Sequence, residues 1–396
     1  MEFSRWKIFL VAFMVLEILA VDFSLILNNN SNFSDQVAAV SESIKTVSSN
    51  AFKYTPPQKL SNPPEIIKAI YVTGYSAGSK KYLNYLSNLF INTEINAVVI
   101  DIKGSSGEVF YASGVPDVKK YNLYRGAIKN IDNLVKFFHE KNIYVIGRIA
   151  VFEDPLYAKA RPEIAVYDKN NLTLWQDNNK LFWLDPASKD AWDYNIALAK
   201  DAFYHGFDEI NFDYVRFPSD GKTKEAGYPF WDRVKLKSDV INEFFHYLRE
   251  QLAREKISVD LFGQVTTNKD DMGIGQLLES SFENFDYISP MIYPSHYVKN
   301  FMKFANPAEH PYEVVKYAMS TALARQNTFY NQKDPLVIRS KFRPWLQDFD
   351  MGASYTADMI KAEIKATQDA LGGQYNGFML WNAANIYTQT AVPGQN

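Results

Sequence analysis

The chain has 396 residues, of which 47% are hydrophobic and 15% aromatic, with a formal net charge of −3. With no cationic excess to neutralise phosphates, this composition argues against nucleic acid as a partner. The absence of cysteine excludes disulfides, iron–sulfur clusters, thiolate zinc sites and a cysteine nucleophile.

The N-terminal segment, residues 1–28, carries a localisation signal. Arg5 and Lys7 precede an apolar run over 8–27, which has about the length needed to span a bilayer. We favour an uncleaved membrane anchor, since no small-residue cleavage site is evident; a removed signal peptide is the alternative. Either interpretation predicts a protein that is anchored facing the extracytoplasmic side, or secreted, because the positive residues stay in the cytoplasm.

Residues 29–63 are expected to form a flexible linker. They are rich in Asn and Ser and close with Pro56-Pro57 and Pro63-Pro64. Such a composition offers little apolar surface to bury and favours a tether. The globular domain is expected over 64–392.

Strand and helix patterns alternate within this domain. We expect strands over 68–76, 96–105, 142–152, 207–217, 257–265, 286–294, 342–349 and 376–385. Helical patterns lie near 79–92, 127–141, 189–205, 231–255, 274–283, 311–331 and 355–371. Eight strands alternating with helices predict an α/β fold, the (β/α)8 TIM barrel. A doubly wound open sheet is the alternative, disfavoured because no glycine-rich dinucleotide motif follows the first strand.

The segment 207–217 shows where the polar residues of this barrel would go. Ile210 and Phe212 share one side of the strand, whereas Asn211 and Asp213 share the other. In a parallel barrel the outward side packs on helices, and inward residues at the carboxyl end line the mouth, where TIM-barrel enzymes hold their active sites. Asp213 is therefore expected at the mouth and Asn211 one layer below.

The same alternation, applied to the other strands, predicts a mouth that combines carboxylates, cations and aromatic rings. The inward or rim positions are Tyr75, Asp101, Lys103, Arg148, Glu153, Asp260, Gln264, Tyr293, Asp348 and Trp381. Structural alternatives remain open for several of them. Asp101 can pair with Lys103 or Arg148 inside the barrel, Asp260 can be a hydrogen-bonded layer filler, and Trp345 can be core or a ligand platform.

Paired carboxylates beside aromatic walls fit the hydrolysis of glycosidic bonds, in which one acid protonates the leaving oxygen and a carboxylate attacks or activates water. Asp213 is the expected nucleophile or base. Asp101 is the first candidate for general acid, followed by Glu153, Asp260 and Asp348. The expected substrate contacts are Tyr75, Lys103, Arg148, Asn211, Arg216, Gln264, Tyr293, Trp345, Asp348 and Trp381.

Other barrel chemistries fit less well, and no cofactor or metal is expected. The five histidines include no His-x-His pair of the kind that metal-dependent hydrolases use. Lys103 lacks the late glycine-rich phosphate loop that would accompany Schiff-base chemistry. Acid-rich loops leave a calcium ion open, but none has the spacing of a dedicated calcium loop.

Four segments, 97–111, 148–166, 183–221 and 289–297, resemble the glycosyl hydrolase-like TIM-barrel family of bacteria, which is distantly related to α-amylase-type glycosidases. The most specific part is FDYVRFP at 212–218, and the resemblance extends over about 64–390. It implies that Asp213 holds the position of the nucleophile and Asp101 an acidic position after the second strand. The chain departs from the family at Gly104-Ser105-Ser106, where acidic residues usually follow the lysine.

These observations predict a glycoside hydrolase acting on a cell-envelope or extracellular polysaccharide or oligosaccharide. The alternative is a catalytically inactive glycan-binding envelope protein, which would explain the aromatic mouth and the anchor without two matched acids. A purely structural envelope protein is the third possibility, and in it the inward polar residues would pair with each other.

Overall fold

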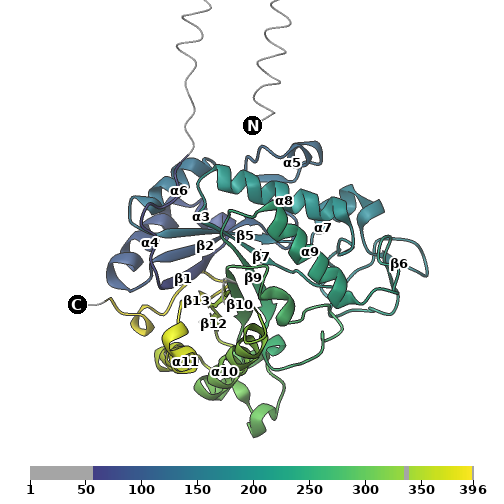
Figure 1. Ribbon diagram of the computed structural model, residues 1–396. Coiled ribbons are helices and arrows are strands. Elements are labelled where there is room, and N and C mark those ends of the chain that lie inside the picture. Colours follow the sequence, from purple (N-terminus) through teal and green to yellow (C-terminus); the bar gives the residue numbers. More distant parts are fainter. Residues whose placement is uncertain (1–56, 334–338, 395–396) are drawn as a thin grey trace, which may run out of the picture. The chain divides into compact units, whose positions relative to one another are not determined.

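A closed barrel of eight parallel strands forms the centre of the computed structural model, which describes residues 57–333 and 339–394 (Figure 1). The strands are β1 (Ile67–Val72), β2 (Ala97–Lys103), β5 (Tyr144–Ala150), β7 (Glu209–Asp213), β9 (Ile257–Phe262), β10 (Tyr287–Met291), β12 (Trp345–Gln347) and β13 (Gly377–Trp381). Because β1 pairs with both β13 and β2, the sheet closes on itself. The predicted TIM barrel is confirmed.

The membrane anchor predicted over 1–28 lies outside the described residues, as does most of the predicted linker over 29–63. Across the described part of the chain, no helix combines the length and the apolar character that crossing a membrane requires.

Helices follow most strands and surround the barrel (Figure 1). They are α3 (Gly74–Ala77), α4 (Lys80–Asn92), α5 (Pro116–Lys120), α6 (Ile131–His139), α7 (Pro155–Ala160), α8 (Lys189–Tyr204), α9 (Lys237–Gln251), α10 (Pro311–Tyr330) and α11 (Ala357–Leu371). The side chains of Ser79, Ser188 and Thr356 accept hydrogen bonds from backbone N–H groups in the first turn of α4, α8 and α11, respectively.

One predicted helix is wrong. The stretch 274–283 contains only a short 3-10 turn, Glu279–Ser281, between β9 and β10. Gly275 adopts a φ of +86°, a left-handed conformation that a right-handed helix does not admit. A β-carbon there would also meet the backbone oxygen of Lys237 at 2.8 Å. The glycine therefore serves a close approach to α9.

Several short strands lie outside the barrel or extend it. β3 (Val109–Tyr111) runs antiparallel to β2 and is joined by β4 (Tyr124–Ile128), while β6 (Tyr167–Asp168) and β8 (Ala226–Gly227) form a separate sheet. The predicted strand 342–349 is divided into β11 (Lys341–Phe342) and β12. Pro344 lies between them and has no N–H to donate to a neighbouring strand.

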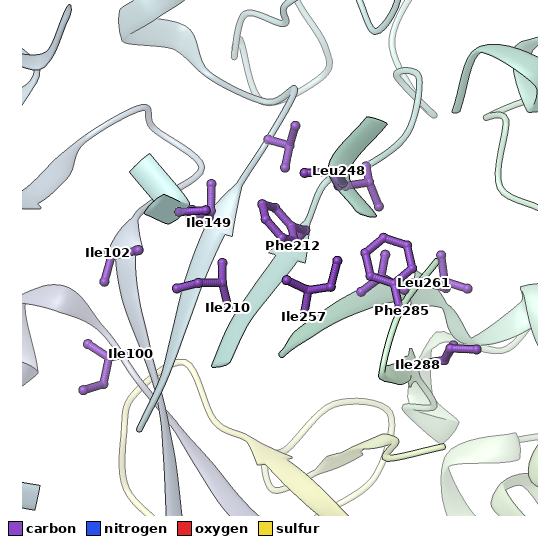
Figure 2. Close-up of a cluster of buried hydrophobic side chains, with 14 of the residues drawn as sticks. Ile100, Ile102, Ile149, Ile210, Phe212, Leu248, Ile257, Leu261, Phe285 and Ile288 are labelled. Atoms are coloured by element: carbon purple, nitrogen blue, oxygen red, sulfur yellow. The ribbon is translucent and has the colours of Figure 1, made fainter. Parts of the chain in front are cut away.

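The outward faces of the strands form the main hydrophobic core. Figure 2 shows side chains of β2, β5, β7 and β9, among them Ile100, Ile149 and Phe212, beside Leu248 of α9. These four residues are buried within one cluster. The alternation seen in the sequence of β7 thus places Ile210 and Phe212 toward the helices and frees the other face for polar groups.

At the amino-terminal end of the barrel, the interior holds a buried ion pair. Arg343 donates from Nη1 to Oε2 of Glu209 at 3.2 Å and also from Nη2 to Oε1, and both side chains are fully enclosed. The hydroxyl of Tyr144 donates to the same carboxylate at 3.3 Å, and the guanidinium lies 4.2 Å from the ring centre of Tyr287. Each charge is therefore compensated inside the barrel.

We expect Arg343→Met to lower the free energy of unfolding by about 3–5 kcal/mol, because it leaves the Glu209 carboxylate buried without a counter-charge. Urea unfolding at neutral pH measures the loss. The double variant Glu209→Gln/Arg343→Met should regain most of it, and Lys361→Met, on the surface of α11, should change stability by less than about 0.5 kcal/mol. A double variant no more stable than Arg343→Met alone would contradict this account.

Candidate active site

Three aspartate side chains meet around Arg148 at the carboxyl end of the barrel. Arg148 lies on β5, Asp101 on β2, Asp213 on β7 and Asp260 on β9. Nη1 of Arg148 donates to Asp101 at 2.6 Å, whereas Nε donates to Oδ2 of Asp213 at 3.2 Å and Nη2 donates to the same oxygen. Nε also lies 3.9 Å from Oδ2 of Asp260. One guanidinium thus orients three carboxyl groups.

Asp213 is held from two directions. The residue after it, Tyr214, has a φ of 53°, which is uncommon for a bulky side chain. That turn brings the N–H of Tyr214 to within 2.6 Å of Oδ1 of Asp213, while Arg148 holds Oδ2. Both contacts compensate a negative charge and fix the carboxylate at the mouth.

Asp101 supports Arg148 and does not line the pocket. Its Oδ2 accepts a hydrogen bond from the hydroxyl of Tyr71 at 2.5 Å, and its Oδ1 accepts from Arg148. Tyr71 in turn stacks on Trp381, with 3.9 Å between ring centres. Burial raises the pKa of Asp101. Because both oxygens are occupied by protein donors, this placement disfavours Asp101 as the first choice of general acid.

Asp260 has one oxygen that accepts hydrogen bonds and one enclosed oxygen that has none. Oδ1 accepts hydrogen bonds from Nδ2 of Asn211 and Nε1 of Trp345, each at 2.8 Å, whereas Oδ2 has no hydrogen-bond partner among the described residues. Burial raises the pKa of Asp260 well above its usual range, and the neighbouring Asp213 raises it further, against the opposing effect of Arg148. A carboxyl that keeps its proton beside a charged carboxylate is the arrangement expected of a general acid.

The spacing of Asp213 and Asp260 is limited by Arg148. One oxygen of each lies within 3.2 Å and 3.9 Å, respectively, of the same Nε atom, so their separation cannot exceed the sum of these distances. Retaining glycosidases place their two carboxyl groups about 5–5.5 Å apart, and inverting ones about 6.5 Å or more apart. The upper bound admits the first separation and the lower end of the second.

A pocket of about 840 Å³ opens above this pair. Its size is typical of small-molecule sites, and aromatic rings of the kind that stack on sugar faces form much of its wall. Of the predicted catalytic and substrate-contacting residues, it is lined by Arg148, Asp213, Arg216, Asp260, Gln264, Tyr293, Trp345 and Trp381. Asn211 lies one layer below and holds Asp260.

Lys103 was expected to point into the mouth, and that expectation is wrong. A bulge between Asp101 and Lys103 shifts the pairing of β2 with β5, so that Asp101 lies opposite Arg148 but Lys103 lies opposite Ile149. The extra residue turns Lys103 toward the helices. There its Nζ is fully buried, 2.6 Å from Oδ2 of Asp154.

Two further predicted contacts lie outside the pocket lining. Tyr75 belongs to α3 and is exposed, with its hydroxyl 3.3 Å from the carboxylate of Glu108. Asp348 accepts hydrogen bonds from the backbone N–H and hydroxyl of Thr388, at 2.9 and 2.8 Å, and so ties β12 to the C-terminal segment.

Loop residues of the pocket escaped the sequence analysis. Tyr214, His296, Phe349 and Met351 line it from the segments after β7, β10 and β12. Strand alternation stops where each strand ends, so it carries no information on these loops. Burial lowers the pKa of His296 and favours its neutral form.

Glu153 is buried at the rim, after β5, without lining the pocket. Burial raises its pKa to about 8; Arg216 lowers it, whereas the charges of Asp177 and Asp213 raise it. Glu153 therefore holds a proton at neutral pH. It is a second buried acid close to Asp213.

The sequence belongs to the family described as "Putative glycosyl hydrolase domain", whose model matches residues 69–387. The predicted family resemblance is confirmed. A hypothetical protein from Ruminiclostridium thermocellum, known from a crystal structure, is 41% identical, with 52% of this chain and 98% of that one covered and a TM-score of 0.45. No match was found among curated proteins.

Two more distant structures share the fold. The glycoside hydrolase domain of PgaB (BpsB) from Bordetella bronchiseptica is 14% identical, with 80% of this chain and 94% of that one covered and a TM-score of 0.57. Alpha-L-fucosidase isoenzyme 2 from Paenibacillus thiaminolyticus is 12% identical, with 82% and 48% covered and a TM-score of 0.51. At these identities the likeness supports the barrel fold alone.

The raised pKa of Glu153 predicts a pH-dependent stability. The folded state binds this proton more tightly than the unfolded state, so the contribution of Glu153 to stability falls as pH rises from about 4.5 to about 8 and is constant outside that window. Wild type should lose free energy of unfolding between pH 5 and 9, and we expect Glu153→Gln to remove about 2–4 kcal/mol of that loss. The size follows from about 1.36 kcal/mol for each unit by which the pKa differs between the folded and unfolded states. Urea unfolding at pH 5, 7 and 9 measures it.

Glu250→Gln, on the exposed side of α9, is the matched control and should follow the wild-type curve. Parallel pH dependence in wild type and Glu153→Gln would show that Glu153 titrates alike in the folded and unfolded states, against this account.

Proposed function

We propose that this protein is a glycoside hydrolase that cleaves a cell-envelope or extracellular polysaccharide at the mouth of its barrel. The observation that carries the proposal is the pair Asp213 and Asp260. One carboxylate is held by donors from two residues, and the other acid has an enclosed oxygen without a partner; the upper bound on their separation admits the distances that glycosidases use. Membership of a glycosyl hydrolase family supports the same reaction class.

In this mechanism Asp260 gives its proton to the glycosidic oxygen as the bond from that oxygen to the anomeric carbon breaks. Asp213 either forms a bond to the anomeric carbon or takes a proton from the attacking water. In the first case, a water molecule later displaces Asp213 and returns a proton to Asp260. Arg148 keeps Asp213 oriented throughout, and Asp101 and Tyr71 keep Arg148 in place.

The pocket walls supply substrate binding in this proposal. Trp381 and Tyr293 offer rings for the C–H faces of sugars, and Trp345 also holds Asp260. We further propose that residues 1–28 anchor the protein with its barrel on the extracytoplasmic side, where such polysaccharides occur. This rests on the basic residues that precede the apolar run.

A glycan-binding protein without turnover is the alternative function. It is favoured by one observation: the carboxyl of Asp260 is 1% exposed, so a substrate must reach deep into the barrel to take its proton. The two functions differ in turnover and agree in binding.

We expect Asp213→Asn to lower the turnover of a cleaved polysaccharide by about 10²–10⁴-fold, because the amide neither attacks nor accepts a proton. Release of reducing ends from a polysaccharide panel measures turnover, with circular dichroism as the check of folding. Asp193→Asn, at an exposed position of α8, should keep wild-type activity. Binding of a panel polysaccharide by wild type, with turnover of none, would overturn the hydrolase and leave the binding protein.

We expect wild-type turnover to fall as pH rises through the raised pKa of Asp260, because the reaction needs its proton. Asp260→Asn should lower turnover by about 10²-fold and remove this alkaline limb, with less loss for substrates whose leaving group needs no proton. The pH–rate profiles of wild type, Asp260→Asn and Glu153→Gln measure it. An alkaline limb that disappears only in Glu153→Gln would assign the proton to Glu153.

A further inference from the structure

Arg216, in the loop after β7, is a buried cation with an open edge. It lines the pocket and is 7% exposed. Nη1 donates to the backbone oxygen of Phe217 at 3.2 Å and to Oγ of Ser219 at 3.1 Å, and these are its only protein hydrogen bonds among the described residues. Neither Nε nor Nη2 is among the fully enclosed polar atoms that lack a partner. Both are therefore at least partly accessible, in a residue that lines the pocket.

Aromatic rings hold the guanidinium in position. Its central carbon lies 4.7 Å from the ring centres of both Trp183 and Phe262, and 5.4 Å from that of Tyr214. Arg216 consequently loses little further freedom when a ligand binds, and its remaining N–H groups already have a fixed direction. The Nε and Nη2 edge of a guanidinium is one of the two forks that match a carboxylate or phosphate.

The charge of Arg216 has no close counter-charge. Across residues 57–333 and 339–394, no carboxylate forms an ion pair with it, in contrast to Arg148, which pairs with three. Burial lowers the pKa of Arg216, and among the carboxyl groups that oppose this shift Glu153 has the largest effect, followed by Asp213 and Asp220. Burial raises the pKa of Glu153 to about 8, which weakens the compensation that this carboxyl can give the guanidinium near pH 7.

A buried arginine keeps its charge, and a buried charge without a partner is costly. We propose that Arg216 is the recognition site for an anionic oxygen group, a carboxylate or a phosphate, on the substrate, so that the pocket selects acidic glycans. The inference rests on the proposed function in one respect, that the ligand is a glycan. Asp213 and Asp260 determine the reaction, whereas Arg216 determines which sugar enters.

Three monosaccharides that differ only at carbon 6 test this: glucose with its hydroxyl, glucuronate with a carboxylate, and glucose 6-phosphate. Their dissociation constants for the full-length wild-type protein are measured by protein-observed NMR titration at pH 7 and constant ionic strength. We expect at least one anion to bind about tenfold or more tightly than glucose, since a charge-assisted fork replaces a neutral hydrogen bond. Preference for glucuronate alone, or for the phosphate alone, identifies the group.

Arg216→Gln should abolish the preference, and Arg216→Lys should retain only part of it, because lysine keeps the charge without the fork. Arg161→Gln, whose ion pairs with Glu163 and Asp190 lie at the surface, is the control and should behave as wild type. Circular dichroism checks the fold of each variant. If Arg216→Gln does not fold, the comparison of the three sugars on wild type and the reduced preference of Arg216→Lys still test whether Arg216 recognises the anion.

Equal binding of the three sugars by wild type, binding of none, or a preference that survives Arg216→Gln would each overturn the proposal. None of these measurements requires turnover. An anion preference in a protein that cleaves no polysaccharide would therefore support the recognition site while overturning the hydrolase.

Discussion

The contact between Arg148 and its three aspartates is the interaction on which the site depends. A single guanidinium joins β2, β5, β7 and β9 across the barrel mouth, so four strands far apart in sequence share one charge network. The network has more acid than base, and burial resolves the excess by raising the pKa of Asp260 and Asp101. Unequal proton affinity within one cluster is what acid–base chemistry needs.

The barrel interior holds a buried pair of an acid and an arginine at each of its two ends. Near the amino-terminal end, Glu209 pairs with Arg343 in a fully enclosed contact with no access to ligand. Near the carboxyl end, Asp213 on the same strand pairs with Arg148 beneath an open pocket. β7 therefore contributes an acid at each end of the barrel. Glu209 stabilises the fold, whereas Asp213 faces the pocket and can take part in chemistry.

The fold was predictable because parallel strands must alternate between a helix-facing side and an axis-facing side. That rule placed Asp101, Arg148, Asp213 and Asp260 on the inner side, where the structure has them. It failed at Lys103, because a one-residue bulge leaves no pattern in the surrounding apolar residues. The rule also does not predict the hydrogen bonds of each acid, because the partners that distinguish Asp101 from Asp260 lie on other strands. These partners are Tyr71 for Asp101 and Trp345 for Asp260.

The backbone conformation of Tyr214 has an energetic cost, and it occurs at a residue that contacts the charged groups of the mouth. A bulky residue in the left-handed region costs about 1–2 kcal/mol, a cost that glycine would avoid. The chain nevertheless keeps tyrosine there, and its ring lies beside the guanidinium groups of both Arg148 and Arg216. Because that ring also packs on Trp183 and the core, glycine would exchange a backbone cost for a loss of buried contacts of similar size. One residue at this turn therefore couples the backbone conformation that positions Asp213 to the packing of both arginines of the mouth, and substitutions there are expected to change both together.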